Sequence, residues 1–132
     1  MIYINIIDGS ARGLPPAGNV FFQMKARETF TPIGPYLVTK DEIANPQNIS
    51  IKLWVNGKLM QDFNTDDMAH SITRCIEWIS HVHTLEPGDI IATGTPAGVG
   101  AGREPQEFMW PGDVLETTVE GIGTLRNPIV AA

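Results

Sequence analysis

The chain has 132 residues, a formal net charge of −6 and a single cysteine, and 42% of its residues are hydrophobic. The acidic balance argues against a nucleic-acid-binding protein, and no apolar stretch approaches the roughly 20 residues that cross a bilayer. One cysteine makes no internal disulfide, which fits a reducing cytoplasm. The 13 glycines and 10 prolines indicate many turns between short strands.

The N-terminal part predicts two strands separated by a loop. Residues 2–7 are mostly β-branched and apolar, which predicts a buried strand that ends at Asp8. Residues 11–18 contain several prolines and glycines and are expected to form a loop. Residues 36–39 are expected to form the second strand.

A capping-box pattern follows this second strand. Thr39 and Glu42 are three residues apart, with the residue types that satisfy each other's backbone N–H groups at a helix start. One helical turn is therefore expected, ending near Pro46.

A β-hairpin is predicted in the middle of the chain. Residues 49–55 alternate between apolar and polar side chains, which is typical of a half-buried strand. Asn56 and Gly57 form the pair preferred in a type I′ turn. Residues 58–63 are then expected to return as the second strand.

One long helix is expected over about residues 66–82, with Asn64 or Thr65 as its cap. Acidic residues in its first turn would be stabilised by the positive end of the helix dipole. Ile72, Ile76 and Ile79 recur at three- and four-residue spacing and predict one apolar face.

Two similar passages follow the helix, each with a Pro-Gly-Asp turn before an apolar stretch: residues 86–91 and residues 110–115. Pro and then Gly at the central positions suit a type II turn, and we interpret the recurrence as common turn chemistry rather than an ancestral repeat.

Residues 115–119 and 124–130 are expected to form a final strand pair. The fold class is mixed α/β, mainly β: a curled mixed β-sheet or roll with the helix packed on it, in a single domain of residues 1–132.

The glycine-rich loop at residues 92–100 is the first candidate site. Residues 90–93 are expected to form a strand that ends inside the protein, after which Gly94 and Gly98 allow unusual backbone geometry. Exposed N–H groups and the hydroxyl of Thr95 would form an anion cradle. The loop lacks the Gly-Lys-Ser/Thr of a Walker motif. It is either a carboxylate-binding loop or a structural turn.

Asp8, Arg12 and Lys25 are the second set of candidates. A carboxylate at the end of a buried strand needs a partner, which is a metal ion, an arginine or backbone donors. Arg12 is close enough in sequence to form a structural ion pair with Asp8. A lone lysine such as Lys25 is usually a solvated surface group.

The histidines and the cysteine form no recognisable catalytic pattern. His70 has no histidine or acid four residues further on, and His81 and His83 are expected to point to different faces at a helix end. Cys75 is interpreted as a buried small hydrophobic residue rather than a nucleophile.

Taken together, these segments resemble the fumarylacetoacetate hydrolase family, in the C-terminal part of its catalytic core. The matching stretches occur in the family's order and cover nearly the whole chain: residues 8–12, Lys25 with residues 29–35, residues 55–57, 61–68, 84–100, 111–114 and 121–127. Each stretch is short, but the ordered series is specific.

The resemblance implies a divalent cation, usually Mg²⁺ and otherwise Mn²⁺ or Ca²⁺, held by two glutamates of a Glu-x-Glu motif and an aspartate that Asp8 matches. Lys25 matches the active-site lysine, and Gly94 with Thr95 matches the loop that holds the substrate's carboxylate. Typical substrates are acylpyruvates and related 2-oxo acids, which are cleaved hydrolytically at a C–C bond. A homodimer through the β-rich core is also implied.

The sequence departs from the family pattern in one important respect. It contains no Glu-x-Glu, which in the family lies upstream of the segment that matches Asp8, as does a lid with a His/Glu pair. We therefore expect half of a catalytic site: either an enzyme completed by another segment or chain, or a non-catalytic member that binds a 2-oxo acid or a partner. Decarboxylation, hydration, isomerisation and ureidoglycolate lysis are the alternative reactions within the family.

Overall fold

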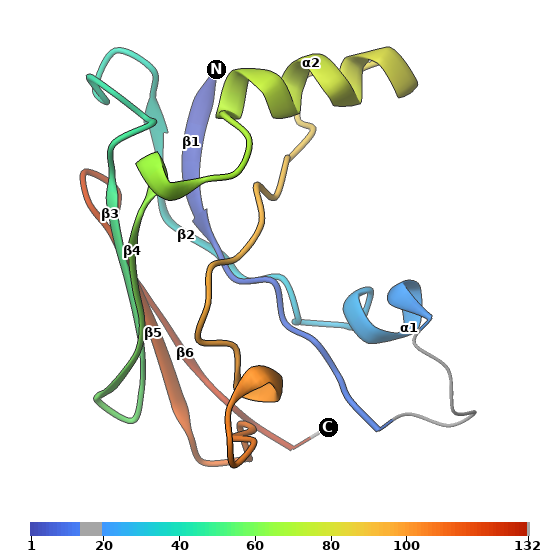
Figure 1. Ribbon diagram of the computed structural model, residues 1–132, viewed down its shortest axis with the longest axis vertical. Helices are drawn as coiled ribbons and strands as arrows, with labels where there is room; N and C mark the ends of the chain where they lie inside the picture. The colour runs from blue at the N-terminus through green and yellow to red at the C-terminus, as the bar shows by residue number, and fades with distance from the viewer. Residues whose placement is uncertain (14–19, 132) are drawn as a thin grey trace.

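The computed structural model describes residues 1–13 and 20–131, and it is mainly β (Figure 1). β1 (Ile2–Ile6) pairs with β2 (Ile33–Thr39). A second sheet has the order β4-β3-β5-β6, and its strands are β3 (Ser50–Val55), β4 (Lys58–Asn64), β5 (Val114–Val119) and β6 (Gly123–Pro128). The predicted fold class is confirmed, and the strand pairs are all antiparallel rather than mixed.

The predicted hairpin is confirmed in position and turn type. Asn56 and Gly57 have φ angles of 51° and 78°, as a type I′ turn requires. The side chain of Asn56 also accepts from the N–H of Val114 at 2.9 Å, and its amide donates to Asp113 at 2.7 Å. The hairpin turn is thereby joined to the start of β5.

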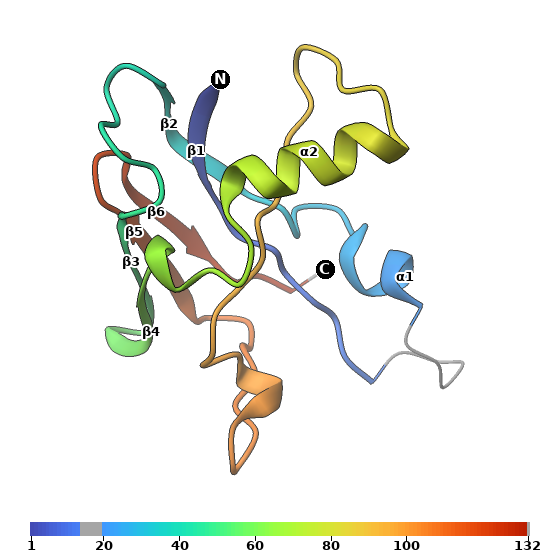
Figure 2. The ribbon, with the colours of Figure 1, turned by 45° about the horizontal axis from the view of Figure 1, so that its top comes forward.

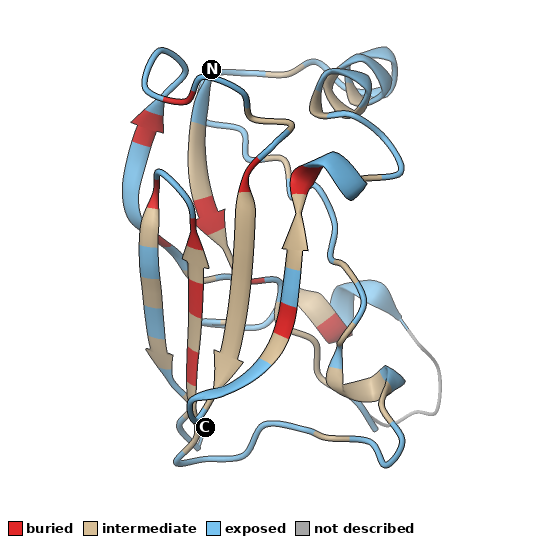
Figure 3. Ribbon diagram, turned by 60° about the vertical axis from the view of Figure 1, so that its left-hand side comes forward, coloured by how far each residue is buried: buried red, intermediate tan, exposed pale blue. Residues whose placement is uncertain are grey.

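The hydrophobic core lies where the two sheets meet. It consists of Val38, Ile43, Ile49, Val119 and Ile122, with Tyr3 and Ile51 packed against it. Figure 3 shows buried and partly exposed positions alternating along β5. The amide of the buried Asn5 donates to the backbone oxygen of Thr117 at 2.7 Å. Because a buried amide needs such a partner, this bond also fixes β1 relative to β5.

The long helix starts later than the sequence predicted. Asn64 caps only the 3-10 turn η1 (Thr65–Asp67), and α2 (Ile72–Val82) begins after Ser71, whose hydroxyl accepts from the N–H of Arg74 at 3.2 Å. The prediction of a start near residue 66 was wrong because Thr65 is tied to the sheet: its hydroxyl donates to Pro46 and accepts from the N–H of Ile49.

α2 lies at the end of the molecule where the N-terminus is found (Figure 1). None of its side chains is fully buried, and Cys75 is half-buried and free. Among the residues that the structure describes, none of the helices has the length and hydrophobicity that a membrane span requires. Figure 2 shows the chain running from α2 past β1 towards the 3-10 turn η2 (Gly100–Gly102).

Residues 90–93, predicted to be a strand, form none. Ile90 is 54% exposed, and in the described part of the chain no backbone hydrogen bond involves residues 90–93. A strand needs a neighbour that accepts and donates its ladder bonds, and among the described strands none pairs with this segment. The prediction was therefore wrong for this chain.

One smaller prediction was wrong, and one short helix was not predicted. Residues 39–42 form a hydrogen-bonded turn rather than a helical turn. The Glu42 carboxylate accepts from the N–H of Thr39 as a capping box predicts, but the Thr39 hydroxyl donates to the same carboxylate instead of accepting from the N–H of Glu42. The short helix α1 (Phe21–Lys25) was not foreseen. Most of the loop predicted at residues 11–18 lies outside the described residues.

Candidate active site

Asp8 and Lys25 lie in direct contact. The Lys25 Nζ is 2.8 Å from the Asp8 Oδ2, and their side chains are 33% and 50% exposed. The pair is thus reachable from solvent rather than a sealed core ion pair. It joins positions 17 residues apart, so the fold, and not sequence proximity, brings the two groups together.

The backbone around Asp8 is held against the segment that precedes β2. The N–H groups of Ile7 and Gly9 donate to Pro32 and Phe30 at 3.1 and 2.9 Å. A Cβ at Gly9 would lie 2.8 Å from the backbone oxygen of Phe30, which is closer than real Cβ contacts allow. Glycine at this position lets the chain approach closely and fixes where the Asp8 carboxylate emerges.

Lys25 is positioned by the short helix α1. Met24 is 5% exposed and anchors the helix, and its backbone oxygen accepts from the N–H of Ala11 at 3.0 Å. That bond ties α1 to the segment just after Asp8. Lys25 is the last residue of α1, where a cation is favoured by the helix dipole.

The glycine-rich loop is held against β4 by Gln61. The Gln61 Nε2 lies 3.3 Å from the hydroxyl of Thr95, 3.3 Å from the oxygen of Pro96 and 3.1 Å from the oxygen of Ala97. Gln61 is buried, whereas Thr95 is exposed. The loop therefore presents an accessible hydroxyl from a backbone that is fixed on its inner side.

A second anchor holds the far end of this loop. Arg103 donates from Nη2 to Met60 at 2.7 Å and from Nε to Gly98 at 3.2 Å. A Cβ at Gly98 would collide with the backbone oxygen of Met60. Gly94 has a φ of 100°, a conformation that favours glycine, and no atom of the residues that the structure describes lies within 4 Å of its Cβ position.

Glu107 and Lys58 fasten the segment that follows η2. The Lys58 Nζ is 2.7 and 3.0 Å from the two carboxylate oxygens of Glu107. This hydrogen bond lowers the pKa of the Glu107 carboxyl, and desolvation partly opposes the shift. The loop of residues 94–107 is thus attached to the β3–β4 hairpin along its length.

The structure brings the predicted site residues together in two separate groups. Asp8 contacts Lys25, whereas Thr95 contacts Gln61; among the residues described, no hydrogen bond connects the groups. Gln61 and Arg103 were missed as loop anchors. Gln61 had a detectable signal, because it occupies the strand face of Leu59 and Phe63, where a polar side chain needs a partner.

The donor set fits part of a metal site. Within residues 1–13 and 20–131, no three His, Cys, Asp or Glu side chains come together as a metal-binding group. Asp8 offers one hard carboxylate oxygen of the kind that Mg²⁺ and Mn²⁺ prefer. The described residues therefore suit a contribution to a shared site rather than a complete one.

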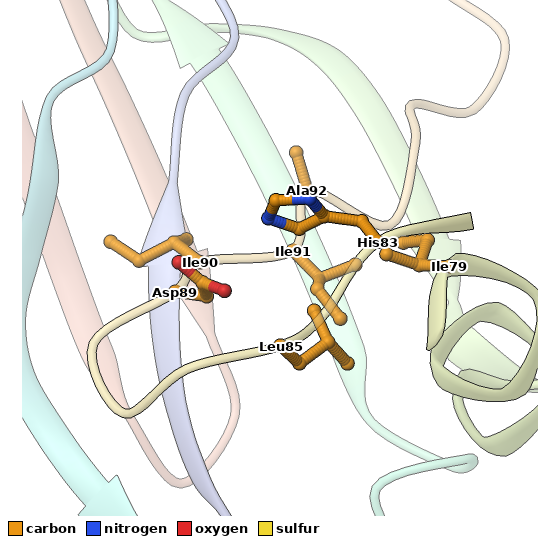
Figure 4. A pocket seen from close by; sticks show the side chains of 7 residues that line it. All are labelled: Ile79, His83, Leu85, Asp89, Ile90, Ile91 and Ala92. Carbon is orange, nitrogen blue, oxygen red and sulfur yellow. The ribbon is translucent and has the colours of Figure 1, made fainter. Parts of the chain in front are cut away.

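The cavity drawn in Figure 4 reaches the glycine-rich loop only at Ala92, and neither the Asp8–Lys25 pair nor Thr95 with Gln61 lines it. It has a volume of about 330 Å³ and is situated between the end of α2 and the segment that follows it. Its lining consists of Ile79, His83, Leu85, Asp89, Ile90, Ile91 and Ala92. None of the predicted site residues is among them, so the cavity does not mark the candidate active site.

Comparison with known proteins identifies the family. A sequence model described as fumarylacetoacetate (FAA) hydrolase C-terminal matches residues 1–130. The chain belongs to the fumarylacetoacetate hydrolase family. An uncharacterized protein of Staphylococcus saprophyticus is 46% identical over 125 residues, which are 95% of this chain and 42% of that protein. This family member thus spans about two fifths of the length of that relative.

Three solved structures of the family share the fold. A fumarylacetoacetate hydrolase from Exiguobacterium antarcticum is 41% identical, with a TM-score of 0.82 over 85% of this chain and 40% of the other. A maleylpyruvate hydrolase from Sphingobium sp. SYK-6 in complex with manganese(II) ion and pyruvate is 33% identical, with a TM-score of 0.77 over 98% and 53%. A 2-hydroxyhepta-2,4-diene-1,7-dioate isomerase from Mycobacterium marinum is 41% identical, with a TM-score of 0.71 over 82% and 39%.

Proposed function

We propose that this chain supplies half of a divalent-metal-dependent active site that cleaves a C–C bond of an acylpyruvate or a related 2-oxo acid by hydrolysis. The observation that carries the proposal is the contact of Asp8 with Lys25 at 2.8 Å. Support comes from the Sphingobium relative, whose structure is a complex with manganese and pyruvate, the simplest 2-oxo acid.

In this proposal each group has a separate task. Asp8 holds the cation, which is Mg²⁺, Mn²⁺ or Ca²⁺ and which when bound polarises the carbonyl of the 2-oxo acid. The Lys25 ammonium donates hydrogen bonds to substrate oxygens and stabilises negative charge that develops on them. Gly94 and Thr95 bind the carboxylate of the substrate through a backbone N–H and a hydroxyl.

A second function is favoured by the small number of metal-binding groups, because Asp8 supplies a single carboxylate. One carboxylate holds Mg²⁺ weakly, because a cation bound by few protein ligands relies on water and substrate. A family member that binds a 2-oxo acid without catalysis, or that completes its site with another chain, is consistent with this. The isomerase from Mycobacterium marinum also keeps isomerisation open as the reaction.

The test is a calorimetric titration of the chain with pyruvate or oxalate in the presence of millimolar Mg²⁺ or Mn²⁺. We expect weak binding that depends on the metal. It should be lost in Asp8→Asn and reduced by roughly 10- to 150-fold in Lys25→Met, since a hydrogen bond to a charged group contributes about 1.5–3 kcal/mol.

The matched control is the second surface pair, Lys52 with Asp62 at 3.1 Å, whose side chains are 43% and 48% exposed. Lys52→Met and Asp62→Asn alter the same residue types on β3 and β4, and Asp62 is exposed on the face of β4 opposite to the buried Gln61. Both should bind as the unaltered chain does. Equal binding by Asp8→Asn and Asp62→Asn would refute the role of Asp8.

We also propose a homodimer as the state in which the chain works. Several large apolar side chains are more than half exposed, including Phe21, Phe22, Leu37 and Trp78, and association would remove such surface from water. Analytical ultracentrifugation at micromolar concentration should show a dimer, and a single monomeric species would count against the proposal.

A further inference from the structure

The side chain of Gln61 contacts more acceptors than its amide has hydrogens. The Nε2 group has two hydrogens and faces three oxygens, those of Thr95, Pro96 and Ala97, at 3.1–3.3 Å. The shortest contact, at 3.1 Å, is to Ala97. We therefore assign one hydrogen to Ala97, and the second is shared between Pro96 and the hydroxyl of Thr95.

This arrangement determines what the Thr95 hydroxyl can do. A hydroxyl has one hydrogen to donate and two lone pairs that accept. Since its oxygen accepts from Gln61, the hydrogen of Thr95 stays free to be donated outwards. Thr95 is exposed, so a ligand from solvent can accept that hydrogen.

The same amide also controls the backbone of the loop. The carbonyl oxygens of Pro96 and Ala97 carry partial negative charge and would repel a carboxylate if they faced it. Their contacts with the buried Gln61 turn both towards β4. Arg103 acts similarly one residue further on, where it binds the oxygen of Gly98 at 3.2 Å.

The geometry points to Gln61 as a positioning residue of an anion-binding loop: its amide makes the Thr95 hydroxyl a donor and holds two carbonyl oxygens away from the bound carboxylate. This assignment rests on the proposed function, because it deepens the role given there to Thr95. Gln61 itself does not touch the substrate, and its effect is transmitted through the hydroxyl and the loop backbone.

The experiment is a double-mutant cycle on oxalate binding at constant Mg²⁺, followed by calorimetry and by amide shifts of the loop in NMR spectra. Gln61→Met keeps the length of the side chain and removes the donor, and Thr95→Val keeps the shape and removes the hydroxyl. We expect each to weaken oxalate binding on the order of tenfold. The double variant should lose less affinity than the product of the two single losses, because the part of the Gln61 effect that passes through the Thr95 hydroxyl is already lost in Thr95→Val.

Gln47→Met is the matched control. The Gln47 amide binds the backbone oxygen of Thr65, and its own oxygen accepts from the N–H of Ile72 at 3.0 Å. Its loss removes a partly buried glutamine that stabilises the η1–α2 connection. We expect a lower unfolding temperature and unchanged oxalate affinity in this variant.

Three outcomes would overturn the assignment, and they are distinguishable. If Gln61→Met and Thr95→Val weaken binding independently, so that their factors multiply, Gln61 is merely structural. If Thr95→Val weakens binding and Gln61→Met does not, the assignment fails and the proposed function stands. If Thr95→Val binds as tightly as the unaltered chain, or if that chain binds no oxalate, the proposed carboxylate site fails and the assignment fails with it.

Discussion

Two Pro-Gly-Asp passages in this chain form the same turn, but only the second turn leads into a paired strand. In each, the N–H of the aspartate donates to the residue three positions earlier, at 3.1 Å in Glu86–Asp89 and 3.0 Å in Trp110–Asp113. In each, the aspartate carboxylate accepts a bond in return, at 2.8 and 2.7 Å. Gly88 and Gly112 have φ angles of 108° and 102°.

The segments that follow these turns are different. After Asp113 the chain enters β5, which pairs with β3 on one side and β6 on the other, and Leu115 is 4% exposed. After Asp89 the chain stays unpaired, and Ile90 is 54% exposed. Turn geometry is thus determined within four residues, whereas strand formation depends on neighbours supplied by the rest of the fold.

The strongest way to test this contrast is to truncate one apolar side chain after each turn. Leu115→Ala should lower the free energy of unfolding by about 2–5 kcal/mol, because it leaves a cavity between paired strands. Ile91→Ala should cost under about 1 kcal/mol, because Ile91 is only half-buried beside an unpaired segment. Urea denaturation followed by circular dichroism measures both. Equal losses would show that residues 90–93 are as structurally important as β5.

The next effect concerns the glycines within the turns. Gly112→Ala should destabilise the chain by about 1–2 kcal/mol, because alanine resists this φ. The turn is also held to the residue that follows β6, since the N–H of Gly112 donates to the oxygen of Ile129 at 2.9 Å. Gly88→Ala carries the same local strain, but the exposed segment after it can rearrange. We expect a change of under about 0.5 kcal/mol in the same denaturation experiment.

The smallest effect is a pH dependence at Asp113. The backbone N–H of Trp110, and then the amide of Asn56, lower the pKa of the Asp113 carboxyl. Stability from this group is present above the usual aspartate pKa of about 4 and is lost as the pH falls through the lower pKa of the folded state.

Asp113→Asn should therefore be less stable than the unaltered chain at about pH 6, and the difference should shrink as the pH falls below about 4. Thermal unfolding across this pH range measures it. Asp89→Asn, in the other turn, should leave global unfolding unchanged. A difference for Asp113→Asn that is constant across the range would contradict the electrostatic origin.

Much of the fold could be predicted from the sequence, because its signals were local. The hairpin at Asn56 and Gly57, the two Pro-Gly-Asp turns and the final strand pair each depend on a few adjacent residues. The start of α2 could not be predicted in this way, because it is set by the Thr65 hydroxyl bound to Pro46 and Ile49. Residues 90–93 have strand-like composition, but composition does not reveal whether a partner strand exists.

In the candidate site, too, the residue types could be recognised in the sequence, whereas their contacts could not. The residue types of Asp8, Lys25 and Thr95 were singled out in the sequence, and the contact of Asp8 with Lys25 is a feature of the structure. Their catalytic and binding roles remain predictions. Arg103 could not be found from sequence, because its partner Met60 is 43 residues away and a single arginine has no distinctive sequence pattern.

The close approach of the loop to β4 has a practical consequence for protein engineering. A side chain at Gly98 would meet Met60, and one at Gly100 would meet the backbone of Glu107, so neither position accepts a larger residue without displacing the loop. Thr95 and Ala97 are exposed. A mutant library intended to broaden ligand preference should therefore vary these two positions and keep both glycines, so that the variants remain folded while the outer surface of the loop changes.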